Sequence, residues 1–279
     1  MIDGMKVFIL FGRERLLFWT NLLLLAGVCL VCALFIWLAT SEDTFDGYGT
    51  ALPIVFAQAC AAILIGLMLS INMVSKDYAM IRRELRMGIS VGTLVMAKTL
   101  LIILACAIMS LILVLPYLVG IISVPGHSSI YLFAAIFFPM FASAQLGLFI
   151  SSLSSFFRSN RLKKIAFAIP FVMLFQILFS GFVFDGVRIE TLQRISISNY
   201  AIRMIGAALR FNVEYYRGTT FIWELPDGQE FGRELFGTDT GIDMEHITET
   251  FGVLMIFVVL AVVASIVVLS RVDKQGFDE

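Results

Sequence analysis

Charge is scarce in this chain: only 15% of its 279 residues are Asp, Glu, Lys or Arg, whereas 59% are hydrophobic. A soluble domain of this length needs far more charge to cover its surface, so a soluble protein is excluded. Cysteine and histidine are also few. The four cysteines, Cys29, Cys32, Cys60 and Cys106, all fall within apolar stretches. We therefore predict no structural disulfide and no Cys-based metal site, and we interpret the two isolated histidines as solvated.

Motifs for catalysis and nucleotide binding are missing as well. The chain has no phosphate-binding loop of the GxxxxGK[ST] type, so ATP used by this protein must be bound by another chain. No Asp or Glu lies within the long apolar stretches, which disfavours a proton- or sodium-coupled transporter without excluding it. No histidine or carboxylate lies at the same depth in the membrane as the serines at positions 70, 110, 143 and 151. An intramembrane hydrolase is therefore poorly supported.

What the sequence does contain is six long apolar stretches. Each approaches the roughly 20 residues that cross the hydrocarbon core of a bilayer as a helix, and hydrocarbon offers no partner to an exposed backbone amide. The sequence therefore predicts an all-α membrane protein with six transmembrane helices. Their expected ranges are residues 16–39, 52–73, 91–115, 131–153, 165–184 and 251–269.

The positions of Lys and Arg predict the orientation of these helices. Basic residues are concentrated in the N-terminal segment 1–15, in the second and fourth connections, and in the tail 270–279. The first and third connections have none. Because cytoplasmic loops carry the excess of Lys and Arg, we expect both termini to be cytoplasmic and the protein to lie in the plasma membrane.

The fifth connection, residues 185–250, is too long for a turn and is expected to form an external segment with its own structure. Its first part, 195–211, has helical spacing with Ser198 or Asn199 as N-cap. Residues 223–228 are typical of a strand that enters a β-turn.

A few polar side chains lie within the predicted spans. Lys98 is about two turns into the third span, where we expect its ammonium group to extend back to the lipid headgroups. Gln58 and Asn72 lie 14 residues apart and project from nearly the same face of the second span. They either line a substrate path or form hydrogen bonds between helices, and Gln176 in the fifth span has the same two interpretations.

The second connection is strongly amphipathic over residues 75–88. Tyr78, Ile81 and Leu85 form a narrow apolar stripe opposite a charged face, and Gly88 is a suitable helix stop. Such a helix either lies on anionic lipid or presents its charge to a cytoplasmic partner.

This segment resembles the one between the second and third spans of ABC export permeases of the G subfamily type, within the type-2 ABC exporter family. The family pattern R-E-x-x-x-G, followed after some ten residues by Lys, stands here as Arg83-Glu84-Leu85-Arg86-Met87-Gly88 and then Lys98. In the family this helix couples the permease to its ATPase. The resemblance implies that the coupling residues are Tyr78, Arg82, Arg83, Glu84 and Arg86.

A second similarity lies at the end of the fifth span. The stretch Phe179-Ser180-Gly181-Phe182-Val183 looks like the family's F-S-G followed by two bulky apolar residues. There, these two residues form a hydrophobic plug across a dimer axis, which implies that role for Phe182 and Val183. The alternative is that both are packed or lipid-facing. The stretch 192–201 looks like the family segment that dips partly back into the membrane, so a partly re-entrant helix is expected before the external segment.

The resemblance implies a permease subunit of an ATP-driven exporter that moves a lipid, peptide, antibiotic or similar molecule out of a bacterial cell. ATP and Mg are then expected on a separate nucleotide-binding subunit, and a second permease copy or sister permease completes the transporter. No nucleic acid is expected as a partner. A polysaccharide exporter is the nearest alternative, although its outer loops tend to be short. An ion-driven transporter or pore, and a membrane sensor or assembly factor, are further alternatives.

Overall fold

The structure is a computed structural model that describes residues 25–36, 38, 48–71, 73–74, 78–119, 129–154, 161–180, 193–209 and 244–275. Within these ranges every regular element is a helix, which agrees with the predicted all-α class. A shorter apolar helix, Leu25–Ile36, comes first. The labelled helices that follow are α2 (Tyr48–Ser70), α3 (Tyr78–Arg86), α4 (Val91–Leu118), α5 (Ser129–Ser154), α6 (Arg161–Leu178), α8 (Ile197–Ala208) and α10 (Met244–Gln275).

Four of these helices contain segments long and apolar enough to cross a membrane: Pro53–Ser70, Val91–Leu118, Ser129–Ser154 and Thr248–Arg271. They coincide with the second, third, fourth and sixth predicted spans. The first and fifth predicted spans are represented by the shorter apolar helices Leu25–Ile36 and Ala168–Leu178. A multi-pass membrane protein is thus confirmed, while the six-span topology stays a prediction.

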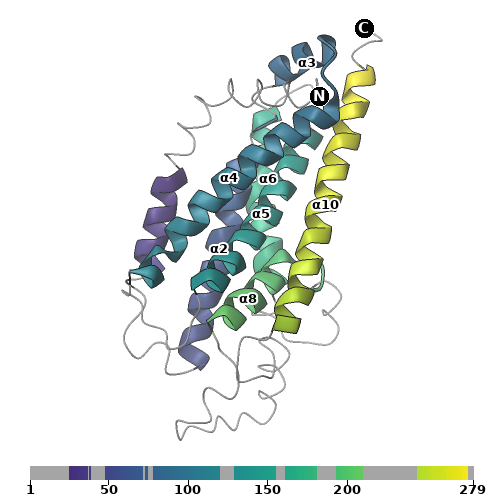
Figure 1. Cartoon of the computed structure of the whole chain (residues 1–279). Coiled ribbons are helices and arrows are strands. Elements are labelled where there is room, and N and C mark those ends of the chain that lie inside the picture. The colour runs from purple at the N-terminus through teal and green to yellow at the C-terminus, as the bar shows by residue number, and fades with distance from the viewer. Residues whose placement is uncertain are drawn as a thin grey trace, which may run out of the picture.

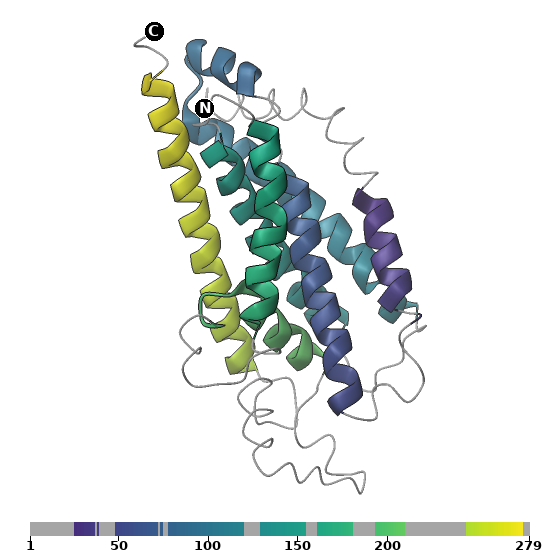
Figure 2. The same ribbon diagram turned by 180° about the vertical axis from the view of Figure 1, so that it is seen from behind.

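Helix α5 lies at the centre of the bundle, where it contacts α2, α4, α6, α8 and α10. Figure 1 and, from behind, Figure 2 show the long helices running side by side. Both views place α3 and the C-terminal end of α10 at one end of the bundle, and α8 near the other end. The two ends therefore carry different elements: an amphipathic surface helix at one and a short packed helix at the other.

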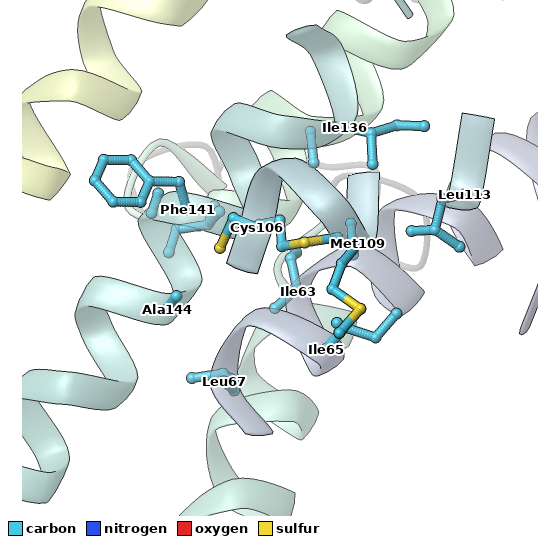
Figure 3. Close-up of a cluster of buried hydrophobic side chains, with 14 of the residues drawn as sticks. Ile63, Ile65, Leu67, Cys106, Met109, Leu113, Ile136, Phe141 and Ala144 are labelled. Carbon is cyan, nitrogen blue, oxygen red and sulfur yellow. The ribbon is translucent and has the colours of Figure 1, made fainter. Parts of the chain in front are cut away.

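The core is formed where α2, α4 and α5 meet. Figure 3 shows side chains of these three helices packed against one another. Ile63 and Leu67 of α2, Met109 of α4 and Ile136 of α5 are almost completely buried there. Lipid tails are as apolar as these side chains, so close packing rather than exclusion of water stabilises such a core.

Helices α2 and α5 approach each other closely because small residues lie at their contact. A Cβ atom added to Gly66 would meet the hydroxyl of Ser143 and the carbonyl oxygen of Met140. A Cβ atom added to Gly147 would in turn meet the hydroxyl of Ser70. Small residues four positions apart, such as Gly66 with Ser70, allow two membrane helices to bring their backbones together.

Large apolar side chains cover the outward faces of the peripheral helices. On the first helix and on α4 they follow helical spacing, so each helix presents one face to the bundle and one to its surroundings. Hydrocarbon is the medium that suits such a surface. The exposed set includes Val31, Phe35, Leu100, Leu104, Leu111, Leu115, Ile256, Val259, Leu260 and Val263.

Candidate functional site

Helix α3 ends in a glycine turn, as the sequence predicts. Gly88 has φ 83°, a left-handed conformation in which glycine carries no Cβ penalty. Its N–H donates to the carbonyl oxygen of Leu85 at 3.0 Å, and the N–H of Ile89 donates to that of Glu84 at 3.2 Å. This pair of hydrogen bonds is a Schellman motif, which satisfies the last carbonyls of α3 and turns the chain sharply.

Helix α4 begins immediately after that turn. Ser90 is its N-cap, with extended backbone (φ −70°, ψ 144°), and its hydroxyl oxygen accepts the N–H of Thr93 at 3.2 Å. The Ser90 and Thr93 hydroxyls are also 2.7 Å apart. Because a C-terminal motif and an N-cap follow each other directly, the angle between α3 and α4 is defined by local hydrogen bonds.

The two faces of α3 differ in charge and burial. Ile81 and Glu84 are each only 2% exposed, and Leu85 is half-buried. Arg83 and Arg86 are exposed on the opposite face, and Arg82 is half-buried. The predicted apolar stripe is present at Ile81 and Leu85; the side chain of Tyr78 lies outside the described part. Glu84, expected among the partner-facing residues, is turned toward this chain's own interior.

Met73 and Val74, which follow α2 on the way to α3, are held by one part-buried and one buried hydrogen bond. The ammonium group of Lys98 donates to the carbonyl oxygen of Met73 at 3.1 Å, and the N–H of Val74 donates to the hydroxyl of Ser151 at 3.0 Å. Lys98 lies on α4 and Ser151 on α5. The entry to α3 is therefore joined to two long helices besides α2, with which it is continuous.

The expectation that Lys98 extends to the lipid headgroups is wrong: its side chain is only 2% exposed. The physical reason is that carbonyl groups past the end of a helix need donors, and the Met73 carbonyl supplies an acceptor within reach. A hydrogen bond to a charged donor is stronger than one between neutral groups.

Replacement of Lys98 by Met is expected to destabilise the protein, because the half-buried Met73 carbonyl loses this donor. An unsatisfied acceptor that is fully buried costs about 1–3 kcal/mol, so the loss here should lie toward the lower end of that range. The midpoint of thermal unfolding in detergent measures the effect. Lys98→Arg retains a donor and should lose less, while Met96→Ala, at an exposed neighbouring position, should leave the midpoint close to wild type. Equal midpoints for Lys98→Met and wild type would contradict this role.

Of the two polar residues predicted on the second span, the structure describes one. Gln58 is buried, and its Oε1 accepts the hydroxyl of Tyr117 on α4 at 3.1 Å. This is the interhelical hydrogen bond that was one of the two interpretations. Asn72 lies outside the described residues, so a substrate path along this face stays a prediction.

Gln176 lies near the end of α6 and supplies the cap of α8. Its Oε1 accepts the hydroxyl of Ser196 at 2.9 Å and the N–H of Ser198 at 3.0 Å, while its backbone carbonyl accepts the hydroxyl of Ser198. The predicted N-cap at Ser198 or Asn199 is wrong, because α8 begins earlier, with Ser196 as N-cap. Ser196 makes no side-chain capping bond, since an acceptor from another helix takes that place.

Replacement of Gln176 by Leu should loosen α8 from α6, because the N–H of Ser198 loses its acceptor, while the hydroxyl of Ser196 keeps that of Ser198 at 2.6 Å. A buried donor left without a partner costs about 1–3 kcal/mol. Hydrogen exchange of α8 amides in detergent reports the change. Gln176→Glu keeps acceptor oxygens and should retain more protection, and Leu174→Ala, at an exposed position on α6, serves as the control. Unchanged protection in Gln176→Leu would show that the cap is dispensable.

The remaining predicted residues fall where the structure gives no description. Phe182 and Val183 lie outside the described residues, and so do parts 185–192 and 210–243 of the external segment predicted at 185–250, including the predicted strand and turn at 223–228. The plug therefore stays a prediction. Among the described residues, Ser151, Ser196 and Tyr117 carry contacts that sequence reasoning missed. Gln145 differs from them: it is fully buried on α5, and its amide has no hydrogen-bond partner in the described part.

The family model for the ABC-2 type transporter matches residues 4–209, which is well over half of the chain. The matched range contains α3, Lys98 and the whole of α8. The search of the curated proteins found no match.

Proposed function

Because this chain belongs to the ABC-2 type transporter family, we propose that it is the membrane-spanning subunit of an exporter that moves a hydrophobic or amphipathic molecule out of the cell. The permease role itself follows from the family and the apolar helices. The direction of transport and the class of substrate are proposals, supported by the G-subfamily-like motifs around α3 and at the end of the fifth predicted span.

The observation that carries the proposal is the way α3 is attached. Its outer face presents Arg83 and Arg86, while its entry is bonded to α4 through Lys98 and to α5 through Ser151. A force that a partner applies to α3 therefore acts on α4 and α5 as well as on α2. Rigid-body motion of packed helices is the established way in which transporters alternate between two states.

The proposed partner on that face is an ATPase subunit that binds ATP and Mg. A second permease copy, or a sister permease, provides the other half of the pathway. In this arrangement α3 and both termini lie in the cytoplasm, in keeping with the Lys and Arg distribution. Phe182 and Val183 form the plug near the outer end, and Asn72 lies along the substrate pathway, whereas Gln58 and Gln176 bond neighbouring helices.

Reconstitution tests the proposal. The purified chain alone should hydrolyse no ATP, and vesicles that contain it with its cognate ATP-binding subunit should show ATP-dependent release or uptake of substrate. A gene for a Walker-type ATPase beside the gene for this chain identifies the subunit to use. Transport by the chain alone that continues after ATP depletion, driven by an ion gradient, would overturn the proposal.

A further inference from the structure

An apolar cavity of about 240 Å³ lies between α5, α6, α10 and the N-terminal end of α8. Ala142 of α5 and Ala261 of α10 form part of its wall, and their small side chains leave the space open. Phe171 and Phe175 of α6 and Phe257 of α10 enclose it with aromatic rings. The cavity is therefore a gap among four helices that no side chain of the described residues fills.

The mouth of this cavity faces the surroundings of the bundle. Phe171 is 73% exposed, and its neighbour Leu174 is exposed on the same helix. On α10, Ile256 and Leu260 are exposed beside the lining residues Phe257 and Ala261. These are the apolar side chains that a membrane helix turns toward lipid. The medium at the mouth is consequently hydrocarbon rather than water.

The interior of the cavity offers too few polar partners to hold a water molecule. Among the described residues that line it, Gln176 alone has a polar side chain, and its Oε1 already accepts hydrogen bonds from Ser196 and Ser198. A buried water needs two to four polar partners, which the alanine, leucine and phenylalanine side chains do not provide. An empty gap is also unfavourable, because the atoms that line it lose dispersion contacts on one side.

We propose that this cavity is a binding site for one acyl chain of a membrane phospholipid, held between α6 and α10. The bilayer supplies that occupant directly at the mouth, and the lining is apolar, as a hydrocarbon chain is. Since lipid tails are as apolar as the lining, packing rather than the hydrophobic effect holds the chain in place. The site does not depend on ATP or on the transported molecule, so it is separate from the proposed function.

Photo-cross-linking tests this site. The full chain is reconstituted in phosphatidylethanolamine and phosphatidylglycerol vesicles that contain a phosphatidylethanolamine with a diazirine midway along one acyl chain. After illumination, mass spectrometry locates the labelled residues. We expect labelling of Phe171, Phe175 and Phe257 to exceed that of Leu104 and Leu111, which are exposed on α4. Equal labelling of both groups would show ordinary contact with bulk lipid and would overturn the proposal.

Filling the cavity provides the second measurement. Ala142→Leu and Ala261→Leu should lower the labelling of the lining to that of the exposed α4 face. Ala264→Leu, a change of the same size at a position of α10 that does not line the cavity, should leave the labelling unchanged. Undiminished labelling in a folded Ala261→Leu protein would contradict the site. If a variant with a filled cavity fails to fold, the distribution of label over the wild-type residues still decides whether the cavity binds a lipid chain.

Adding the ATPase subunit distinguishes a resident phospholipid from a transported molecule as the occupant of the cavity. A resident phospholipid should label the cavity to the same extent with and without ATP hydrolysis. Loss of the label during ATP hydrolysis would show that transported molecules occupy the cavity. This result would overturn the assignment to a resident lipid. Absence of transport in the same vesicles would leave the lipid result standing, so failure of the two proposals can be told apart.

Discussion

Combined charge reversal of Arg83 and Arg86 to Glu is expected to abolish assembly of this chain with its ATPase subunit. Both side chains lie exposed on the outer face of α3, one turn apart, so they can contact a partner together. Breaking one charge pair that is buried and hydrogen-bonded at an interface costs about 2–5 kcal/mol, and reversal adds repulsion. Co-purification of the ATPase subunit, and stimulation of its ATP hydrolysis, measure the loss.

The control for this pair is Arg194→Glu. Arg194 is also exposed, but it lies beside the start of α8, near the opposite end of the bundle from α3. Its reversal should leave the co-purification intact. The double variant should keep the thermal unfolding midpoint of the wild type, because neither arginine is buried. A double variant that assembles and transports like the wild type would exclude α3 as the docking helix.

Glu84 is less suitable for this test than the two arginines. It is buried against the rest of the chain, so its substitution disturbs folding as well as any contact with a partner. The family resemblance places Arg83 and Glu84 side by side in one motif, but adjacent residues of a helix point in different directions. The motif therefore combines an outward-facing residue with an inward-facing one.

The helices could be predicted from sequence because their signals are local. Continuous apolar stretches predicted four spans that the structure contains, and the stripe at Ile81 and Leu85 with Gly88 predicted the position and end of α3. Each of these features depends on neighbouring residues. The helix from 195 was predicted for the same reason, although its N-cap was not.

The polar contacts could not be predicted, because their partners are distant in sequence. Lys98 bonds a carbonyl 25 residues away, and Val74 bonds a hydroxyl 77 residues away. Gln176 caps a helix that begins about twenty residues later. A lysine or glutamine in a span suggests function or structure equally well until the helix that packs against it is known. The sequence thus identified these polar residues, but it did not reveal what each of them contacts.

The replacement Gly66→Ala is expected to destabilise the whole bundle, because the new methyl group would overlap the Met140 carbonyl oxygen as well as the Ser143 hydroxyl. The hydroxyl can rotate, but the carbonyl belongs to the backbone of α5, so α2 and α5 must move apart. Overpacking of this kind costs about 1–3 kcal/mol, occasionally more. A maleimide dye that reacts with the buried thiols of Cys29 and Cys106 on unfolding reports the midpoint.

The matched control is Gly92→Ala on α4, where an added Cβ has no neighbour within 4 Å. There the same change should be neutral or stabilising, by up to about 1 kcal/mol, because alanine favours a helix. The two variants add the same methyl group to helical glycines and differ only in what it meets. Equal midpoints for both would show that α2 and α5 lie farther apart than the structure places them. Since α5 contacts every other long helix, a wider gap there would also alter how a push on α3 reaches the bundle.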